Sequence, residues 1–362
     1  MLDATLKTLD AAGLQQFFAV RGDVIQTVTE RFYATHGSAY ARFGPGGRQA
    51  CQEDLSFHLE FLRPVLEFGL LQPMVDYLIW LDSVLVARAI PSEHLALSLD
   101  WLGEAFKQTM DVGPGAVVVQ SLAAARDGFL QAGKSSAPVP LPQAVWPQAQ
   151  AFEAALLRGD RLEALAVMNR AMDGGHNLVE VEMHLIQPAL YQIGEKWQAN
   201  QISVAQEHMA TAIVEMVMPM GLLRSPPPAQ IGKSVILACV QGNQHAVGLA
   251  MVSDAFSLAG WQVQYLGADV PTRALVAQIV DARPDLVGLS VSFPQQLRVV
   301  KEVIGELQEK LGPGRPAVMI GGLAVNRFSR LSEVLGADAS GVNAQAAVMR
   351  ASQMAAPGAG QL

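Results

Sequence analysis

The sequence predicts a multidomain protein with an all-α N-terminal domain, a four-helix bundle and a C-terminal α/β domain built on a parallel sheet. Apolar residues recur at helical spacing in the first part of the chain, whereas short apolar runs alternate with helical patterns in the last part. Two proline-rich segments, 133–147 and 224–233, separate the three regions. A chain of 362 residues is too long for one core of ordinary size, so two or three domains are expected.

The first region, residues 1–132, is predicted to be helical throughout. Apolar residues recur every three or four positions in the segments 54–71, 74–90 and 94–110, as they do on the buried face of a helix. Pro64 and Pro73 are expected to punctuate these helices, because proline lacks the amide hydrogen that a helix interior uses.

The second region, residues 143–223, is predicted to form a bundle of four helices. The helical patterns cover 144–159, 160–175, 176–198 and 203–223, with short connections between them. Asp160 and Ser203 stand where N-cap residues are expected, because their side-chain oxygens can accept hydrogen bonds from the first free amides of a helix. Helices of this length with short loops favour an up-down arrangement.

The third region, residues 233–355, is predicted to contain a doubly wound parallel sheet. Its strand candidates are the apolar runs 234–240, 261–267, 285–292 and 317–322, and helical patterns lie between them at 245–260, 272–282 and 294–311. Ligands of such sheets bind beyond the carboxyl ends of the strands, so the loops at that edge are the candidate binding residues.

Composition and charge exclude several classes of protein. The net charge of -8 and the scattered basic residues argue against a nucleic-acid-binding surface. Cys51 and Cys239 lie far apart and form no metal-binding or disulfide pattern, which favours a reducing, cytoplasmic location. The most apolar segment, 210–223, is interrupted by Glu215 and Pro219, so we expect no membrane span and no membrane partner.

The loop after the first predicted strand contains a candidate ligand. His245 stands near the start of a helix, two residues after Asn243 and three residues before Gly248. An imidazole in such a loop can reach a bound group, and Gly248 permits a bulky group to approach the backbone closely. The alternative is a helix-capping or solvated histidine.

Two neighbouring loops extend this candidate site. The third predicted strand ends in Ser290-Val291-Ser292, which supplies two hydroxyl groups, and the fourth ends in Gly321-Gly322. Capping of a strand end and a tight turn are the alternative explanations. The carboxyl ends of parallel strands meet at one edge, so the three loops together predict a pocket with a ligating histidine, hydroxyl donors and an open backbone floor.

This arrangement resembles the cobalamin-binding domain shared by methionine synthase and methylmalonyl-CoA mutase, in which D-x-H-x-x-G, S-x-L and a glycine pair follow one another along a Rossmann-like, flavodoxin-like fold. The resemblance implies that His245 is the lower ligand to cobalt, in place of the cofactor's own dimethylbenzimidazole base. It also implies that the cofactor contacts Asn243, Gln244, Gly248, Ser290, Val291, Ser292, Gly321 and Gly322. Asn243 replaces the family's aspartate and Ser292 its frequent leucine, so a charged partner for the histidine is missing.

The middle region carries a second motif. Trp197 is followed ten residues later by Glu207 and His208, a spacing that resembles the bundle of CarH-type light sensors, which bind adenosylcobalamin. The resemblance implies that these three residues surround the upper adenosyl group; the alternative is a buried tryptophan with a solvated Glu-His pair. Gln198 stands where CarH has a histidine that ligates cobalt after photolysis. If light acts, water or another histidine must take that upper position, and His176, His184 and His208 are the candidates of this region.

The N-terminal region is similar in helical character and length to that of the photocobilins, which join a CarH-like module to a bilin. This resemblance implies biliverdin as a second chromophore. The aromatic and basic residues available for it are Phe57, His58, Phe61, Arg63, Tyr77 and Trp80, and Cys51 is a candidate for a thioether bond. The alternative for each of these residues is a place in the apolar core.

The sequence thus predicts an adenosylcobalamin-dependent light sensor and not an enzyme, because no barrel-length catalytic region is present. We expect a homo-oligomer whose assembly depends on light, an unidentified downstream protein partner, and no DNA binding. Two alternatives remain: a corrinoid protein that carries methyl groups between separate methyltransferases, and a cobalamin-responsive regulator or storage protein that works without light.

Overall fold

The computed structural model describes residues 6–44, 46–132, 144–327 and 335–354. The chain divides into two compact units, one comprising residues 1–139 with 198–200 and the other residues 140–197 with 201–362. Most of the predicted linker at 133–147 lies outside the described residues.

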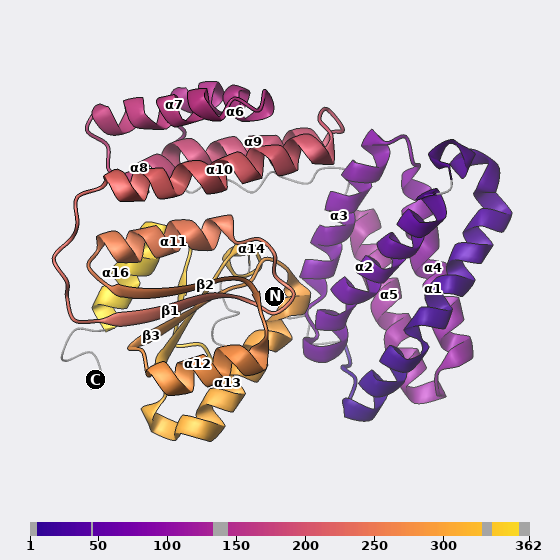
Figure 1. The fold of residues 1–362 in the computed structure, drawn as a ribbon. Coiled ribbons are helices and arrows are strands. Elements are labelled where there is room, and N and C mark those ends of the chain that lie inside the picture. Colours follow the sequence, from indigo (N-terminus) through magenta and orange to yellow (C-terminus); the bar gives the residue numbers. More distant parts are fainter. Residues whose placement is uncertain (1–5, 45, 133–143, 328–334, 355–362) are drawn as a thin grey trace. The chain divides into compact units, whose positions relative to one another are not determined.

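The N-terminal unit is helical, as predicted. Its helices are α1 (Ala11–Tyr40), α2 (Gly46–Phe68), α3 (Leu71–Ala87), α4 (Ser92–Thr109) and α5 (Val112–Ala132), with a short 3-10 turn η1 (Ala41–Phe43) after α1 (Figure 1). Apolar side chains from all five fill one core, in which the rings of Phe17 and Phe106 stack with centroids 5.2 Å apart.

The two prolines of this unit do not act as the sequence pattern suggested. Pro64 lies inside α2 and is buried together with Leu62, Val65 and Leu66, so the expected break is wrong. Burial of this apolar face compensates for the one backbone hydrogen bond that proline removes. Pro73 is the third residue of α3, where the amide would have no partner within the helix.

The middle helices are α6 (Gln148–Leu157), α7 (Arg161–Asp173), α8 (Leu178–Val181), the π-helical segment η2 (Glu182–Ile186), α9 (Gln187–Gln198) and α10 (Val204–Arg224). Asp160 and Ser203 accept hydrogen bonds from the amides of Glu163 and Gln206, which confirms both predicted N-caps. The π segment inserts one wider turn between α8 and α9, a feature that often accompanies functional sites.

The described residues of the C-terminal region form a five-stranded parallel sheet in the order β2-β1-β3-β4-β5, as expected for a flavodoxin-like domain. The strands are β1 (Ser234–Val240), β2 (Gln262–Val270), β3 (Leu286–Ser290), β4 (Ala317–Gly321) and β5 (Ala339–Gly341). β5 has three residues and no apolar run, which explains why the sequence pattern did not predict it. The strand order reverses between β1 and β3. The loops after these two strands therefore flank the topological switch point, where sheets of this kind bind their ligands.

Helices cover both faces of this sheet (Figure 1). α11 (Val247–Leu258) and α16 (Ala344–Met354) lie on one face, and α12 (Thr272–Ala282) and α13 (Leu297–Leu311) lie on the other, while α14 (Leu323–Arg327) follows β4. The middle helices pack over α11, whose Met251 and Ala255 belong to the same buried cluster as Phe152, Ile186 and Val214. This shared core explains why the middle helices and the sheet form one compact unit.

Within the ranges that the structure describes, every helix is either too short or too polar to span a bilayer.

One glycine joins the proline-rich segment 224–233 to the sheet. Gly260, in the turn between α11 and β2, has a φ of +84° and accepts a hydrogen bond from the amide of Ile231 (3.0 Å). A Cβ at this position would collide with the carbonyl oxygen of Ala229. The turn therefore requires both the left-handed backbone and the absence of a side chain.

We expect Gly260→Ala to destabilise the protein by roughly 2–4 kcal/mol, because it combines backbone strain with a collision against main-chain atoms. The matched control is Gly312→Ala, since Gly312 has a φ of +56° but nothing within 4 Å of a Cβ. Thermal unfolding followed by circular dichroism measures both variants. Equal losses of stability would show that the contact with Ala229 does not matter.

Candidate functional site

The candidate site is centred on the loop between β1 and α11. His245 is exposed in this loop, and its ring and that of Phe293 meet edge to face, with centroids 5.0 Å apart. Desolvation by the neighbouring protein lowers the pKa of His245 below its ordinary value of 6.5, and the charge of Glu207 acts more weakly in the opposite direction. The imidazole is therefore neutral at pH 7, the form in which a ring nitrogen can ligate a metal.

Asn243 fixes the backbone of this loop. Its side chain is fully buried: Nδ2 donates to the carbonyl oxygen of Ser290 (2.9 Å), and Oδ1 accepts from the amide of His245 (3.1 Å). An ionised aspartate could accept the second bond but could not donate the first. The asparagine thus joins the loops after β1 and β3, and it contacts the main chain of His245 rather than its ring.

The serine and glycine loops lie beside this loop, at the ends of β3 and β4. Ser290 is buried, and Val291 donates its amide to Gly321 (2.9 Å). Gly322 has a φ of +100°, and a Cβ there would collide with the carbonyl of Val291. A Cβ on Gly321 would lie 3.0 Å from the carbonyl oxygen of Gly341. The protein's own backbone therefore gives a reason for both glycines, in agreement with the tight turn that was the alternative to ligand contact.

Gly248 differs from these two glycines. It is exposed in the first turn of α11, and a Cβ built there would meet nothing within 4 Å. The packing of the protein does not require glycine at this position, so the missing side chain leaves space open one helical turn from His245. This open floor beside a neutral histidine fits a bulky planar group such as a corrin ring.

The first turn of α10 lies close to the same loop. The carboxylate of Glu207 influences the pKa of His245, accepts from Thr211 Oγ1 (3.2 Å) and lies 2.5 Å from His208 Nδ1. Trp197 is half-buried in the last turn of α9. The structure thus places Glu207 of the predicted upper site within electrostatic reach of His245 of the predicted lower site, and His208 beside Glu207.

The other histidines of the middle helices lie at a different place. The rings of His176 and His184 both contact Trp146, with centroids 4.1 and 5.2 Å away, and His184 Nδ1 lies 2.6 Å from the carbonyl oxygen of Ala144. Of the three candidates for an upper ligand, His208 alone among these described residues neighbours Glu207.

Gln198, which replaces the histidine of CarH, belongs to the compact unit of the N-terminal helices. Its side-chain nitrogen donates to Ser83 Oγ of α3, and its main-chain carbonyl oxygen accepts from Arg88 Nη1 (3.4 Å). The residue is therefore held by α3 through its side chain and by the residue after α3 through its main chain.

Several of the predicted bilin contacts form one buried cluster in the N-terminal unit. His58 Nδ1 lies 3.0 Å from the hydroxyl of Tyr77, whose ring stacks on Phe61 with centroids 3.9 Å apart. Burial lowers the pKa of His58 to about 4, so the imidazole is neutral. Trp80 is near Tyr77, with ring centroids 6.2 Å apart, whereas Phe57 is exposed.

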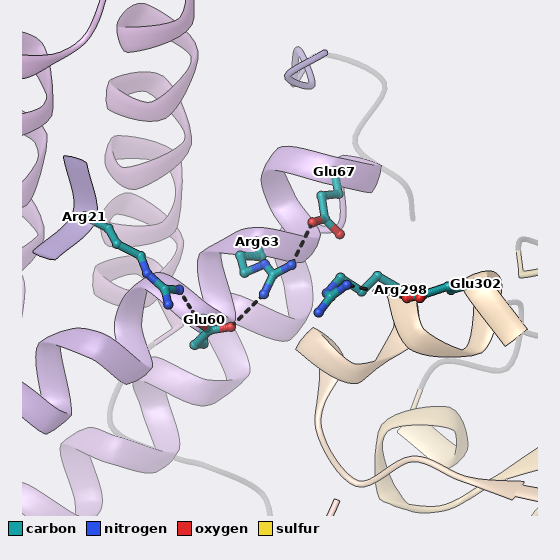
Figure 2. Close-up of polar contacts among 6 residues, drawn as sticks. All are labelled: Arg21, Glu60, Arg63, Glu67, Arg298 and Glu302. Carbon is teal, nitrogen blue, oxygen red and sulfur yellow. Dashed lines mark hydrogen bonds and ion pairs between the residues drawn. The ribbon is translucent and has the colours of Figure 1, made fainter. Parts of the chain in front are cut away.

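The other two predicted bilin contacts are less available. Figure 2 shows Arg63 between the carboxylates of Glu60 (3.1 Å) and Glu67 (3.2 Å), with Glu60 also bound to Arg21. Burial, followed by the charge of Asp54, raises the pKa of Cys51 to about 11, so its thiol is protonated at pH 7 and weakly nucleophilic.

A second aromatic cluster of the N-terminal unit escaped the sequence analysis. The rings of His36 and His94 lie 4.3 Å apart, and Tyr40 places its hydroxyl 2.7 Å from His94 Nδ1. Trp101 stacks on His36, whose buried Nε2 has no hydrogen-bond partner among the described residues. These residues come from α1 and α4, so only the tertiary fold brings them together.

The contact between the middle helices and α11 contains a buried acid pair. Glu182, in the π segment, is completely buried, and its carboxyl group lies within hydrogen-bonding reach of the carboxyl group of Asp254 in α11. Burial and the nearby Asp254 of α11 raise the pKa of Glu182 well above 4.5. Burial also raises the pKa of Asp254. The pair therefore holds a proton at neutral pH.

Comparison with known proteins agrees with this geometry. A family model described as a B12 binding domain matches residues 233–349, and a second model with the same description matches residues 148–220. The sheet domain and the middle helices thus define a cobalamin-binding protein. The chain belongs to the family of B12-binding proteins.

Two kinds of relative are similar to the chain. The HTH-type transcriptional repressors CarA and CarH of Myxococcus xanthus are 30% and 29% identical over 47% and 42% of this chain, which spans 57% and 50% of their length. Dimethylamine corrinoid protein 3 of Methanosarcina mazei is 30% identical over 34% of this chain and 72% of its own length. The solved monomethylamine corrinoid protein of Methanosarcina barkeri is 20% identical over 57% of this chain and 95% of its own, with a TM-score of 0.47.

The acid pair predicts a specific dependence of stability on pH. A carboxyl group whose pKa is raised by folding stabilises the folded state below its unfolded pKa, and this contribution is lost as the pH rises towards the folded pKa. We expect Glu182→Gln to remove this loss, so that at pH 8–9 the variant is more stable than the wild type by roughly 1–3 kcal/mol.

Glu195→Gln is the matched control, because Glu195 is an exposed residue of α9. Thermal unfolding of the wild type and both variants between pH 5 and pH 9 makes the comparison. A Glu182→Gln curve parallel to that of the wild type would show that Glu182 is ionised in the folded protein.

Proposed function

We propose that the protein is a light sensor that uses adenosylcobalamin and has no enzymatic activity of its own. The observation that carries this proposal is that the carboxylate of Glu207, from the W-x9-EH motif, acts electrostatically on the imidazole of His245, the proposed lower ligand. Residues from α10 and from the β1–α11 loop are then available on opposite sides of one bound corrin. The match to the repressors CarA and CarH supports the same class.

Several residues have defined parts in this proposal. His245 holds the lower side of the cofactor through its neutral imidazole, and Trp197 and Glu207 contact the group on the upper side. Adenosylcobalamin supplies a cobalt–carbon bond that visible light breaks. The upper group contacts α10 before illumination and is absent after it. A contact that exists in only one of two states is the difference that a conformational switch requires. The middle helices then shift relative to α11, and the assembly of a homo-oligomer changes.

The N-terminal unit is proposed to bind biliverdin. The neutral His58, its neighbour Tyr77 and the stacked Phe61 offer polar atoms within an apolar cluster, as the pyrrole nitrogens of a bilin require. The protonated thiol of Cys51 favours a bilin held without a covalent bond. The signal is proposed to pass to another protein rather than to DNA, because the net charge is -8.

A corrinoid methyl carrier is the second candidate, and the match to dimethylamine corrinoid protein 3 favours it. A carrier whose cofactor alternately accepts and releases a methyl group benefits from a lower ligand whose basicity a charged partner can adjust. Asn243 provides no such charge, and it is fully engaged with backbone groups. This residue favours the light sensor over the carrier, and it equally fits a regulator that responds to cobalamin without light.

His245→Ala tests the lower ligand. With methylcobinamide, a corrinoid that has no base of its own, we expect the variant to lose the absorption band of a nitrogen-ligated corrin and to bind at least 10-fold more weakly, which corresponds to about 1.4 kcal/mol. His176→Ala is the control, because His176 is an exposed histidine that lies beside Trp146, away from the His245 loop. An unchanged spectrum in the His245 variant would exclude this residue as the ligand.

Illumination tests the whole function. Protein reconstituted in the dark with adenosylcobalamin and biliverdin is expected to change its cobalamin spectrum irreversibly under green light and to show a separate red-absorbing bilin band. Its mass in light scattering is expected to change at the same time. Conversion without a bilin band would remove biliverdin from the proposal. Preference for methylcobalamin, with no retention of the adenosyl form, would favour the methyl carrier.

A further inference from the structure

We propose that Gln296 and Asp269 are positioning residues that hold the His245 loop in its ligand-binding conformation before the cofactor arrives. Neither residue belongs to a motif of the sequence analysis. The proposal rests on the proposed role of His245 as the lower ligand, and it concerns how the protein presents this side chain.

Gln296 clamps the loop from the side of β3. Its side chain is buried, with 4% of its surface exposed, directly before α13. Oε1 accepts hydrogen bonds from the amides of Ser292 (3.0 Å) and Phe293 (3.1 Å), while Nε2 donates to the carbonyl oxygen of Gly242 (2.8 Å). One side chain thus ties the loop that carries Phe293 to the loop that carries His245.

Asp269 clamps the loop from the side of β2. Its carboxylate accepts from the amide of Gly242 (2.6 Å) and from Nε2 of Gln244 (3.0 Å), and its own amide donates to the carbonyl oxygen of Asn243 (2.9 Å). Asp269 has a φ of +50°, an unfavourable backbone angle for a residue with a side chain. Such strain persists only where surrounding interactions enforce it.

Together the two residues fix both faces of the short segment before His245. Gly242 is held through its carbonyl oxygen by Gln296 and through its amide by Asp269. Gln296 also accepts from the amide of Phe293, whose ring lies against the imidazole of His245. A ligand that is already ordered loses less entropy on binding, so the clamp lets His245 compete with the cofactor's own base.

Gln296→Glu separates positioning from simple loss of packing. Glutamate has the same length and still accepts from Ser292 and Phe293, but its carboxylate cannot donate to Gly242 and repels that carbonyl oxygen. The matched control is Gln278→Glu on α12, where an exposed amide donates to Gln264 Oε1 (2.9 Å). Asp269→Asn tests the contribution of Asp269, because it keeps the shape of the side chain and one acceptor oxygen but removes the charge.

The first measurement is amide hydrogen exchange of the cofactor-free full-length protein. We expect peptides covering 241–246 to exchange at least 10-fold faster in Gln296→Glu and in Asp269→Asn, with the rest of the sheet domain unchanged. Gln278→Glu is expected to match the wild type. Wild-type exchange in both clamp variants would overturn the proposal, and so would equal acceleration throughout the domain, which indicates general destabilisation.

The second measurement is the fraction of bound cobalamin whose cobalt is ligated by histidine, because the cofactor's own base also ligates through nitrogen. It is read from the superhyperfine pattern of the Co(II) form in protein labelled with nitrogen-15 in histidine. We expect this fraction to fall in both clamp variants while the control keeps the wild-type value. Faster exchange with an unchanged fraction would overturn the positioning role. If histidine does not ligate cobalt in the wild-type protein, the assignment of His245 and its proposed positioning are both refuted. Hydrogen exchange would still report whether Gln296 and Asp269 order the loop.

Discussion

The parallel pairing of β1 with β3 and of β3 with β4 is the constraint on which the rest of the site depends. In this register Cys239 pairs with Ser290, and Ser290 pairs with Gly321, so all three strands end at one level. The loops that follow them must then meet at one edge of the sheet. The buried side-chain amide of Asn243 holds the loops after β1 and β3 together, because it bonds to the backbone of both.

The contact between the middle helices and α11 is a second constraint on the structure. They share a buried apolar cluster with α11, which favours a fixed position over the sheet. The same contact contains Glu182 and Asp254, two buried carboxyl groups that disfavour close packing once both are ionised. Because the pair holds a proton at neutral pH, the contact is stable there, and a pH high enough to ionise both acids weakens it.

The sequence was most informative where one physical signal dominated. The run 234–240 corresponds to β1 because a strand buried on both faces needs continuous apolar residues, and Asp160 and Ser203 cap helices because free amides need acceptors. Pro64 was misjudged because tertiary packing outweighs a local preference. Asp269, Gln296 and the His36–His94 contact were missed because their partners are distant in sequence.

The identity of the atom that ligates cobalt from below is the most direct test of the proposed role of His245. Protein labelled with nitrogen-15 in histidine alone, loaded with unlabelled cobalamin in its Co(II) form, gives an electron paramagnetic resonance spectrum that reports the ligating nitrogen. A His245 ligand predicts that labelling converts each triplet of the superhyperfine pattern into a doublet. Triplets that persist after labelling would mean that the cofactor keeps its own base, which would contradict the account.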